Sequence, residues 1–124
     1  MNHVMSLYER IGGAQSVQAT VALLYDKILS DPLLIPFFKD INVERLRTSQ
    51  FAFVSMAFGG PTHYSGETMR RAHERLVERG LSDVHFDQVA LHLKTSMEDL
   101  GVPPGLITEA LSIVETTRPD VLNR

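Results

Sequence analysis

Apolar side chains recur at helical spacing along most of the chain, and clusters of glycine and proline separate the runs that they form. Between about residues 14 and 30, for example, Val17, Val21, Leu24 and Ile28 fall on one face of a helix. No segment shows the alternation of polar and apolar residues that marks a half-buried strand. The pattern predicts an all-α fold of helical segments interrupted at Gly12-Gly13, Gly59-Gly60-Pro61 and Pro103-Pro104-Gly105.

These interruptions also favour one kind of helix packing. A bundle of nearly parallel helices needs only short loops, whereas paired glycines and prolines allow helices to turn sharply across one another. We therefore expect crossed helices, with a wedge between them where a flat ligand could lie. Two helix starts can be located, because Ser6 and Glu9 have the spacing of a capping box and Asn42 can cap a helix over about residues 43–58.

Length and composition exclude several classes of function. The 124 residues suit a single domain over 1–124, with residues 1–5 as a loose N-terminal tail. A net charge of −3 argues against a nucleic-acid partner, which a basic surface would bind. Cysteine is absent, which excludes disulfides, thiolate metal sites and cysteine nucleophiles. The sequence shows neither a signal-peptide layout nor an apolar run long enough to cross a membrane, so we expect a cytoplasmic protein without a membrane partner.

One histidine interrupts an apolar stripe. Met69, Leu76 and Val77 recur at helical spacing in the segment of about 68–79, and His73 falls among them. A buried polar atom without a partner costs about 1–3 kcal/mol, so the inner nitrogen of His73 needs a carbonyl, a hydroxyl, a water or a metal. Spacing alone leaves these alternatives open, and a hydrogen-bonded core histidine is the simplest of them.

Two further polar residues fall on apolar faces. Tyr25 lies on the inner face of the helix over 14–30, where its hydroxyl either makes one hydrogen bond within the core or points at a ligand. Gln50 shares its helix face with Leu46 and Phe53, and its amide must bond either the protein or a ligand.

Several short motifs, in this order and at these spacings, resemble the truncated haemoglobins of group I (N-type). The resemblance runs from about residue 6 to residue 124 and implies a two-on-two helical sandwich around haem b. The motifs that carry it are the stretch from Leu7 to Gly13, Tyr25, Phe37-Phe38, Ala57-Phe58-Gly59-Gly60, Met69 with Ala72-His73, His85-Phe86, and Val121-Leu122-Asn123.

The resemblance implies roles for individual residues. His73 matches the proximal histidine that binds the iron, and Phe38 the aromatic residue that stacks near the macrocycle. Tyr25 and Gln50 match distal positions whose side chains donate hydrogen bonds to a bound ligand. The apolar walls would come from Leu46, Phe53, Met69, Leu76, Phe86, Val89 and Leu93.

The sequence also departs from some members of that family. Ser49 stands where certain relatives carry a histidine as sixth iron ligand, and it is too short to ligate. Leu46 is apolar where relatives can be polar. Glu115-Thr116-Thr117-Arg118 contains no histidine that could bond a haem vinyl group, so we expect non-covalent haem. Arg45, Arg70 and His85 are candidate partners for the propionates.

We therefore expect a monomeric haem protein that binds dioxygen, nitric oxide and carbon monoxide reversibly at ferrous iron, with oxygen binding or transport as its function. An enzymatic alternative is nitric oxide dioxygenation, in which the bound oxygen oxidises nitric oxide and a reductase restores ferrous iron; no separate catalytic residue is assigned. A third alternative, from another class, is a cofactor-free helical interaction module.

Overall fold

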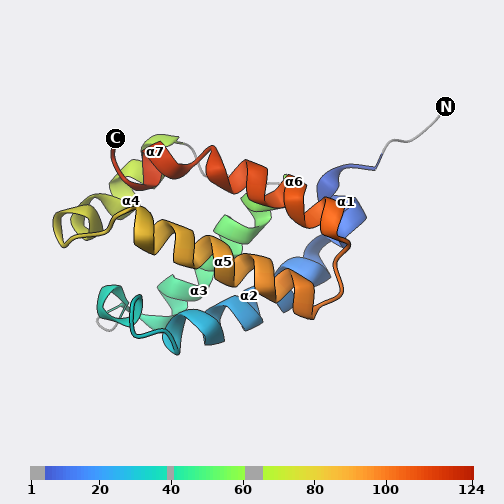
Figure 1. Ribbon diagram of the computed structural model, residues 1–124, viewed down its shortest axis with the longest axis horizontal. Coiled ribbons are helices and arrows are strands. Elements are labelled where there is room, and N and C mark those ends of the chain that lie inside the picture. The colour runs from blue at the N-terminus through green and yellow to red at the C-terminus, as the bar shows by residue number, and fades with distance from the viewer. Residues whose placement is uncertain (1–4, 39–40, 61–65) are drawn as a thin grey trace.

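The computed structural model describes residues 5–38, 41–60 and 66–124, and within these ranges it is helical without strands (Figure 1). The all-α prediction is confirmed. Most of the predicted N-terminal tail lies outside the described residues. The elements are α1 (Leu7–Ile11), α2 (Gly13–Leu29), the 3-10 helix η1 (Ile35–Phe37), α3 (Val43–Ala57), α4 (Gly66–Glu78), α5 (Asp83–Asp99), α6 (Pro104–Glu115) and α7 (Arg118–Val121).

Four long helices form two packed pairs. Helix α2 packs on α3 and α5 packs on α6, while contacts of α2 with α5 and of α3 with α6 join the pairs. This is the two-on-two arrangement expected from the sequence. Helices α4 and α7 lie together at one end of the molecule, beyond the C-terminal end of α6 (Figure 1).

Capping hydrogen bonds and one close contact show why the helices begin and end at these residues. The Ser6 hydroxyl accepts from the Glu9 amide at 3.2 Å, and the Glu9 carboxylate accepts from the Ser6 amide, which completes the predicted capping box. The Asn42 side chain accepts from the amides of Glu44 and Arg45, as predicted. Gly60 is required by close packing, because a Cβ atom there would overlap the ring of Tyr8.

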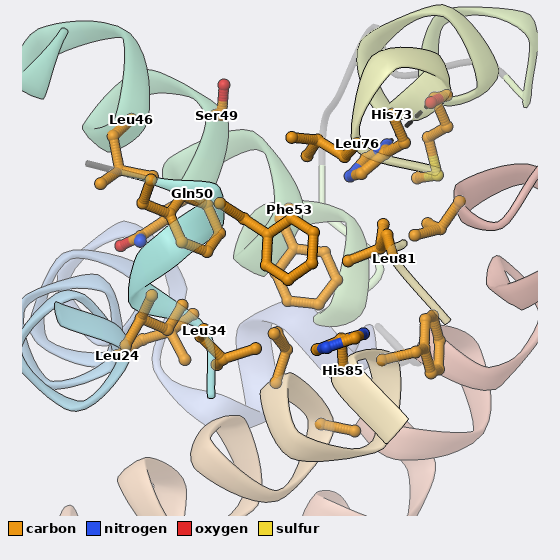
Figure 2. Close-up of a pocket in the computed structure, with 18 of the residues that line it drawn as sticks. Leu24, Leu34, Leu46, Ser49, Gln50, Phe53, His73, Leu76, Leu81 and His85 are labelled. Atoms are coloured by element: carbon orange, nitrogen blue, oxygen red, sulfur yellow. Dashed lines mark hydrogen bonds between the residues drawn. The ribbon is translucent and has the colours of Figure 1, made fainter. Parts of the chain in front are cut away.

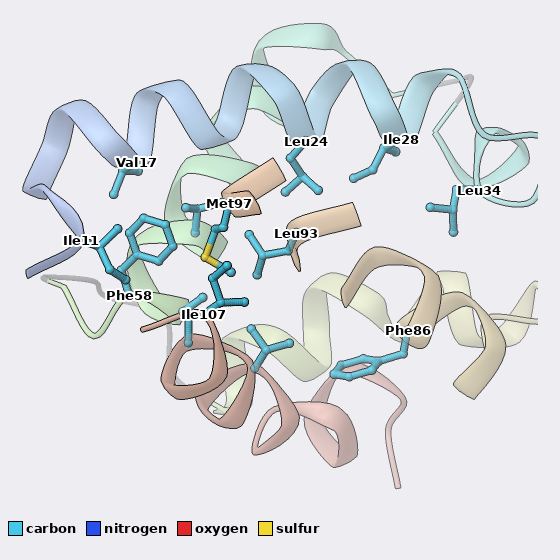
Figure 3. Packing of buried hydrophobic residues seen from close by; sticks show 14 of the residues in the cluster. Ile11, Val17, Leu24, Ile28, Leu34, Phe58, Phe86, Leu93, Met97 and Ile107 are labelled. Carbon is cyan, nitrogen blue, oxygen red and sulfur yellow. The ribbon is translucent and has the colours of Figure 1, made fainter. Parts of the chain in front are cut away.

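The core lies between the two helix pairs (Figure 3). Leu24 of α2, Phe58 at the end of α3, and Leu93 and Met97 of α5 have essentially no exposed surface. Helical spacing predicts the inward position of Leu24. Within the described ranges, none of the helices has both the length and the apolar character needed to cross a bilayer.

Candidate cofactor pocket

A pocket with mostly apolar walls opens between α3, α4 and the start of α5 (Figure 2). Its walls include most of the residues that the sequence singled out: Phe38, Leu46, Ser49, Gln50, Phe53, Met69, His73, Leu76, His85, Phe86 and Val89. The structure therefore brings together side chains from α3, α4, α5 and the residue that follows η1.

His73 projects into this pocket from α4. Its Nδ1 lies 2.7 Å from the carbonyl oxygen of Met69, and because a carbonyl can only accept, Nδ1 carries the proton. Nε2 is then the bare nitrogen, and it lies on the pocket side of the ring (Figure 2). Burial lowers the pKa of His73, against the opposing effect of the Met69 hydrogen bond, so the neutral imidazole is favoured. A neutral imidazole with a free Nε2 is a metal ligand by chemistry.

Gln50 projects from α3 on the other side of the pocket, with Phe53 between it and His73 in this view (Figure 2). The residue is only 5% exposed. Neither its amide nitrogen nor its amide oxygen has a hydrogen-bond partner in the described part of the chain. Each unpaired buried polar atom costs about 1–3 kcal/mol, so such a side chain marks a place where a ligand can supply the missing partner.

Tyr25 is where the structure departs from expectation. It is half-buried and is not part of the pocket wall, because Leu24 and Ile28 occupy the inner face of α2. Its ring instead lies under the guanidinium of Arg47, whose Cζ is 5.1 Å from the ring centroid. The expectation that Tyr25 points inward is therefore not met in this structure, and a distal role requires the side chain to leave Arg47.

Three other predicted contacts are also placed differently. Arg45 is exposed and outside the wall, and Leu93 lies in the core behind it. The guanidinium of Arg70 is engaged elsewhere, with Asp120 at 2.9 Å and the Arg124 carbonyl at 2.7 Å. The resemblance implied a wall position for Leu93, but the residue belongs to a second layer of packing behind the wall.

His85 is the one propionate candidate that lines the pocket. Its Nδ1 accepts from the Ser82 amide at 3.0 Å, and its ring packs edge-on against Phe37 with centroids 4.7 Å apart. Nδ1 is thereby occupied as an acceptor, which leaves the neutral ring with a proton on Nε2. His85 can therefore donate from Nε2 to an anionic group at the pocket.

Part of the pocket wall consists of residues that were not predicted from the sequence to line it. The additional lining residues are Leu24, Ile28, Leu34, Phe37, Leu81, Ala90, Val114 and Val121. For some of these the signal was present, because Leu24, Ile28 and Val114 occupy inward positions of their helices. Leu34, Leu81 and Val121 lie in or next to short connections, where helical spacing carries no information.

The arrangement fits a haem in its chemistry. An imidazole nitrogen without a proton faces the pocket from one side, an unpaired amide lies on the other, and the walls between them are apolar. A single histidine suits a metal whose other ligands come from a macrocycle, as in haem proteins.

Comparison with known proteins agrees with this chemistry. The model of the family described as bacterial-like globin matches residues 6–123, nearly the whole chain. The chain therefore belongs to the bacterial-like globin family.

Individual relatives narrow the assignment. A group 1 truncated haemoglobin of Tetrahymena pyriformis is 36% identical over 124 residues and is covered in full, as is this chain. A group 1 truncated haemoglobin of Chlamydomonas moewusii is 41% identical over 118 residues, which cover 95% of this chain and 68% of that protein. The crystal structure of the 2/2 haemoglobin of Synechococcus sp. PCC 7002, in the cyanomet state with covalently attached haem, superimposes with a TM-score of 0.87 at 41% identity. The superposition covers 97% of this chain and 100% of the Synechococcus chain.

These relatives place the chain among the group 1 truncated haemoglobins, with the 2/2 globin fold. As a globin, it is a haem-binding protein that binds diatomic ligands.

Proposed function

We propose that the pocket holds haem b without a covalent link, that Nε2 of His73 is the proximal iron ligand, and that Gln50 and Tyr25 donate hydrogen bonds to the diatomic ligand. The observation that carries this proposal is the pairing of a pocket-facing imidazole nitrogen with a buried amide that lacks any partner in the described chain. The haem, when bound, supplies the iron at which diatomic ligands bind.

On the proximal side, the protein prepares the imidazole before any cofactor enters. The Met69 carbonyl fixes the tautomer and the ring orientation, and burial keeps the ring neutral at physiological pH. Hydrogen bonding of the second ring nitrogen is the usual way in which proteins orient a ligating histidine and raise its basicity.

On the distal side, Gln50 supplies an amide N–H in surroundings from which water is largely excluded. A diatomic ligand with partial negative charge on its outer atom, such as dioxygen, would accept that hydrogen bond and so satisfy one of the unpaired atoms. Leu46 and Phe53 add apolar walls beside it. Tyr25 lies one residue from the wall residue Leu24, and its hydroxyl would join Gln50 after its ring leaves Arg47.

The non-covalent attachment rests on this chain's own residues. No histidine occurs from Glu115 to Arg118, so a bond from this stretch to a haem vinyl group is not available. Ser49 lines the pocket, but its hydroxyl is too short to serve as a sixth iron ligand. The iron would therefore keep an open distal position for its ligand.

Reversible oxygen binding in a cytoplasmic monomer is the physiological role that we propose. Nitric oxide dioxygenation would use the same pocket, the same donors and a reductase. Mixing the oxygenated protein with nitric oxide in a stopped-flow instrument, followed by a turnover assay with a reductase, separates the two. Sustained turnover would assign the enzymatic role, and failure to recycle the ferric product would exclude it.

The direct test of the proposal compares oxygen dissociation rates. Replacing both donors, Tyr25→Phe with Gln50→Leu, should raise the rate at least about tenfold, because about 1.4 kcal/mol corresponds to a factor of ten. Gln18→Leu, an identical exchange at an exposed position of α2, is the matched control and should leave the rate unchanged. An unaltered rate in the double variant would refute the distal roles.

A further inference from the structure

The helix that carries His73 is attached to the molecule mainly through the C-terminal helix. Helices α2, α3, α5 and α6 pack on one another in a closed arrangement, whereas α4 packs extensively only against α7 within the described chain (Figure 1). The position of His73 therefore depends on how α7 holds α4.

Three hydrogen bonds that involve one residue of α4, two donated by it and one accepted, make this attachment. Arg70 donates from Nε to the Asp120 carboxylate at 2.9 Å and from its terminal nitrogen to the Arg124 carbonyl at 2.7 Å. The Asn123 side-chain amide donates to the carbonyl oxygen of Arg70 at 3.1 Å. We call Arg70, Asp120, Asn123 and Arg124 the C-terminal clasp.

Asn123 has a backbone conformation that suits this task. Its φ is 55°, the one positive value outside glycine in the described part of the chain. Asparagine is among the few residues other than glycine that enter the left-handed region readily. This conformation allows the chain after α7 to turn so that the side-chain amide reaches Arg70 on α4.

The C-terminal clasp includes a hydrogen bond to the carbonyl group of Arg70, which is next in sequence to the carbonyl group of Met69 that orients the imidazole. Met69 precedes Arg70, and the Met69 carbonyl accepts the hydrogen bond that His73 Nδ1 donates. Asn123 thus fixes one carbonyl of α4 while the neighbouring carbonyl fixes the ring. A rotation of α4 about its axis would move both together.

The other end of the clasp is anchored on α5. Arg124 pairs with Asp83, and Arg118 pairs with Asp83 at 2.9 Å and also with Asp87. The Arg118 guanidinium also lies 4.3 Å from the ring centroid of Phe86, a pocket residue. Helix α7 therefore connects α4 to α5, the helix that supplies the facing wall of the pocket.

We propose that the C-terminal clasp is a positioning device that sets the orientation of the His73 imidazole toward the haem iron. The inference rests on the proposed proximal role of His73. Exposed ion pairs contribute little to folding stability, and both Arg70 and Asp120 are partly exposed. Three bonds converging on one residue instead restrict how α4 can turn and slide.

The test uses the haem-loaded ferrous protein without a distal ligand. Asn123→Gly removes the amide but keeps the left-handed backbone free of strain, and Asp120→Asn removes the carboxylate charge at constant size. The iron–histidine stretching frequency, measured by resonance Raman spectroscopy, should shift in Asn123→Gly and, by less, in Asp120→Asn. Transfer of haem to excess apomyoglobin should be about tenfold faster in Asn123→Gly, the lower end of the range for groups that support metal ligands.

Glu67→Gln is the matched control, because it removes the exposed Glu67–Arg71 ion pair within α4, which does not involve α7. It should leave the stretching frequency unchanged. An unchanged frequency in both clasp variants would overturn the proposal, as would an equal shift in the control. Should Asn123→Gly fail to fold, Asp120→Asn alone decides. Absence of an iron–histidine line from the unaltered protein would instead refute the proximal role of His73.

Discussion

The proximal and distal sides of the pocket differ in how completely the protein fixes their polar groups. On the proximal side, His73 is bonded to the Met69 carbonyl, and its helix is held by the C-terminal clasp. On the distal side, both amide atoms of Gln50 lack partners in the described chain, and Tyr25 is held outside the wall by Arg47. Within the described chain, the hydrogen bonds that orient the site residue are therefore formed on the proximal side and are missing on the distal side.

This difference matches the tasks that the two sides would perform. The proximal group would hold a cofactor in one position, so a single fixed geometry is favourable. The distal groups meet a small ligand that enters and leaves, and an unpaired donor makes ligand binding more favourable because the ligand removes the cost of burying it.

The largest effect should follow from removing the proximal imidazole. We expect His73→Gly to lower haem affinity by more than about 100-fold, beyond the upper range seen when only a supporting group of a metal ligand is lost. Haem retention through gel filtration, followed by absorbance, measures this loss. Free imidazole should restore binding in the space that the side chain leaves. Retention equal to that of the unaltered protein would assign the iron to another ligand.

Acid should release the haem through the same group. Burial, the larger cause, lowers the pKa of His73, so the folded protein takes up its proton at a lower pH than the unfolded chain, whose histidine titrates near 6.5. The unfolded state then binds more protons between these values, and stability falls as the pH drops below about 6.5. Titrating the haem absorbance downward from pH 8 measures the release, for which a midpoint above 6.5 would contradict the neutral buried imidazole.

Asp31 should affect the folding stability of the protein in a separate, more acidic pH range than His73. Burial would raise the pKa of Asp31, but hydrogen bonds from His92, Gln88 and the Leu33 amide outweigh burial and hold it below 3.8. Its stabilising contribution is present above pH 3.8 and is lost as the pH falls through the lower, folded value. Asp31→Asn should therefore alter acid unfolding without moving haem release at higher pH.

On the distal side, Gln50→Leu should stabilise the protein while it weakens oxygen binding. Removing an unpaired buried amide should raise the stability of the ferrous, unliganded protein by about 1 kcal/mol. For a chain of this size that gain corresponds to an increase of about 4 °C in the unfolding midpoint. Thermal unfolding under anaerobic conditions measures it, with Gln18→Leu as the exposed control. A lower midpoint would mean that Gln50 has a partner in the unliganded protein.

The smallest effect concerns Tyr25. An exposed cation–π contact is worth about 0.5–1 kcal/mol, so Arg47→Met should release the ring and slow oxygen dissociation by about two- to fivefold. Arg45→Met, on the same helix but without this ring contact, is the control. Faster dissociation in Arg47→Met would show that Arg47 itself, and not Tyr25, favours the bound ligand.

Features set by neighbouring residues were predictable from the sequence. The caps at Ser6 and Asn42 follow from local hydrogen bonding, and the inward positions of Val17, Leu24 and Ile28 follow from helical spacing; these predictions are confirmed, whereas that for Tyr25 on the same face is not. The inward positions of His73 and Gln50 follow from the same spacing. Helix α4 begins at Gly66, slightly earlier than the expected Thr68.

Features set by distant partners were not predictable. Arg70 was a candidate for the propionates because of its charge, but its partner Asp120 lies 50 residues further along the chain. Tyr25 was expected to point inward, yet its ring lies against the guanidinium of Arg47 from another helix. Spacing identifies the face of a helix on which a residue lies, and it does not identify the side chain that covers it.

The most direct test of the account is the resonance Raman spectrum of the ferrous, unliganded protein prepared with ordinary and with ¹⁵N-labelled histidine. We predict an iron–histidine line that moves on labelling, disappears in His73→Gly and returns when imidazole is added. A line whose frequency does not change on ¹⁵N labelling, or that persists in His73→Gly, would contradict the claim that this imidazole binds the iron.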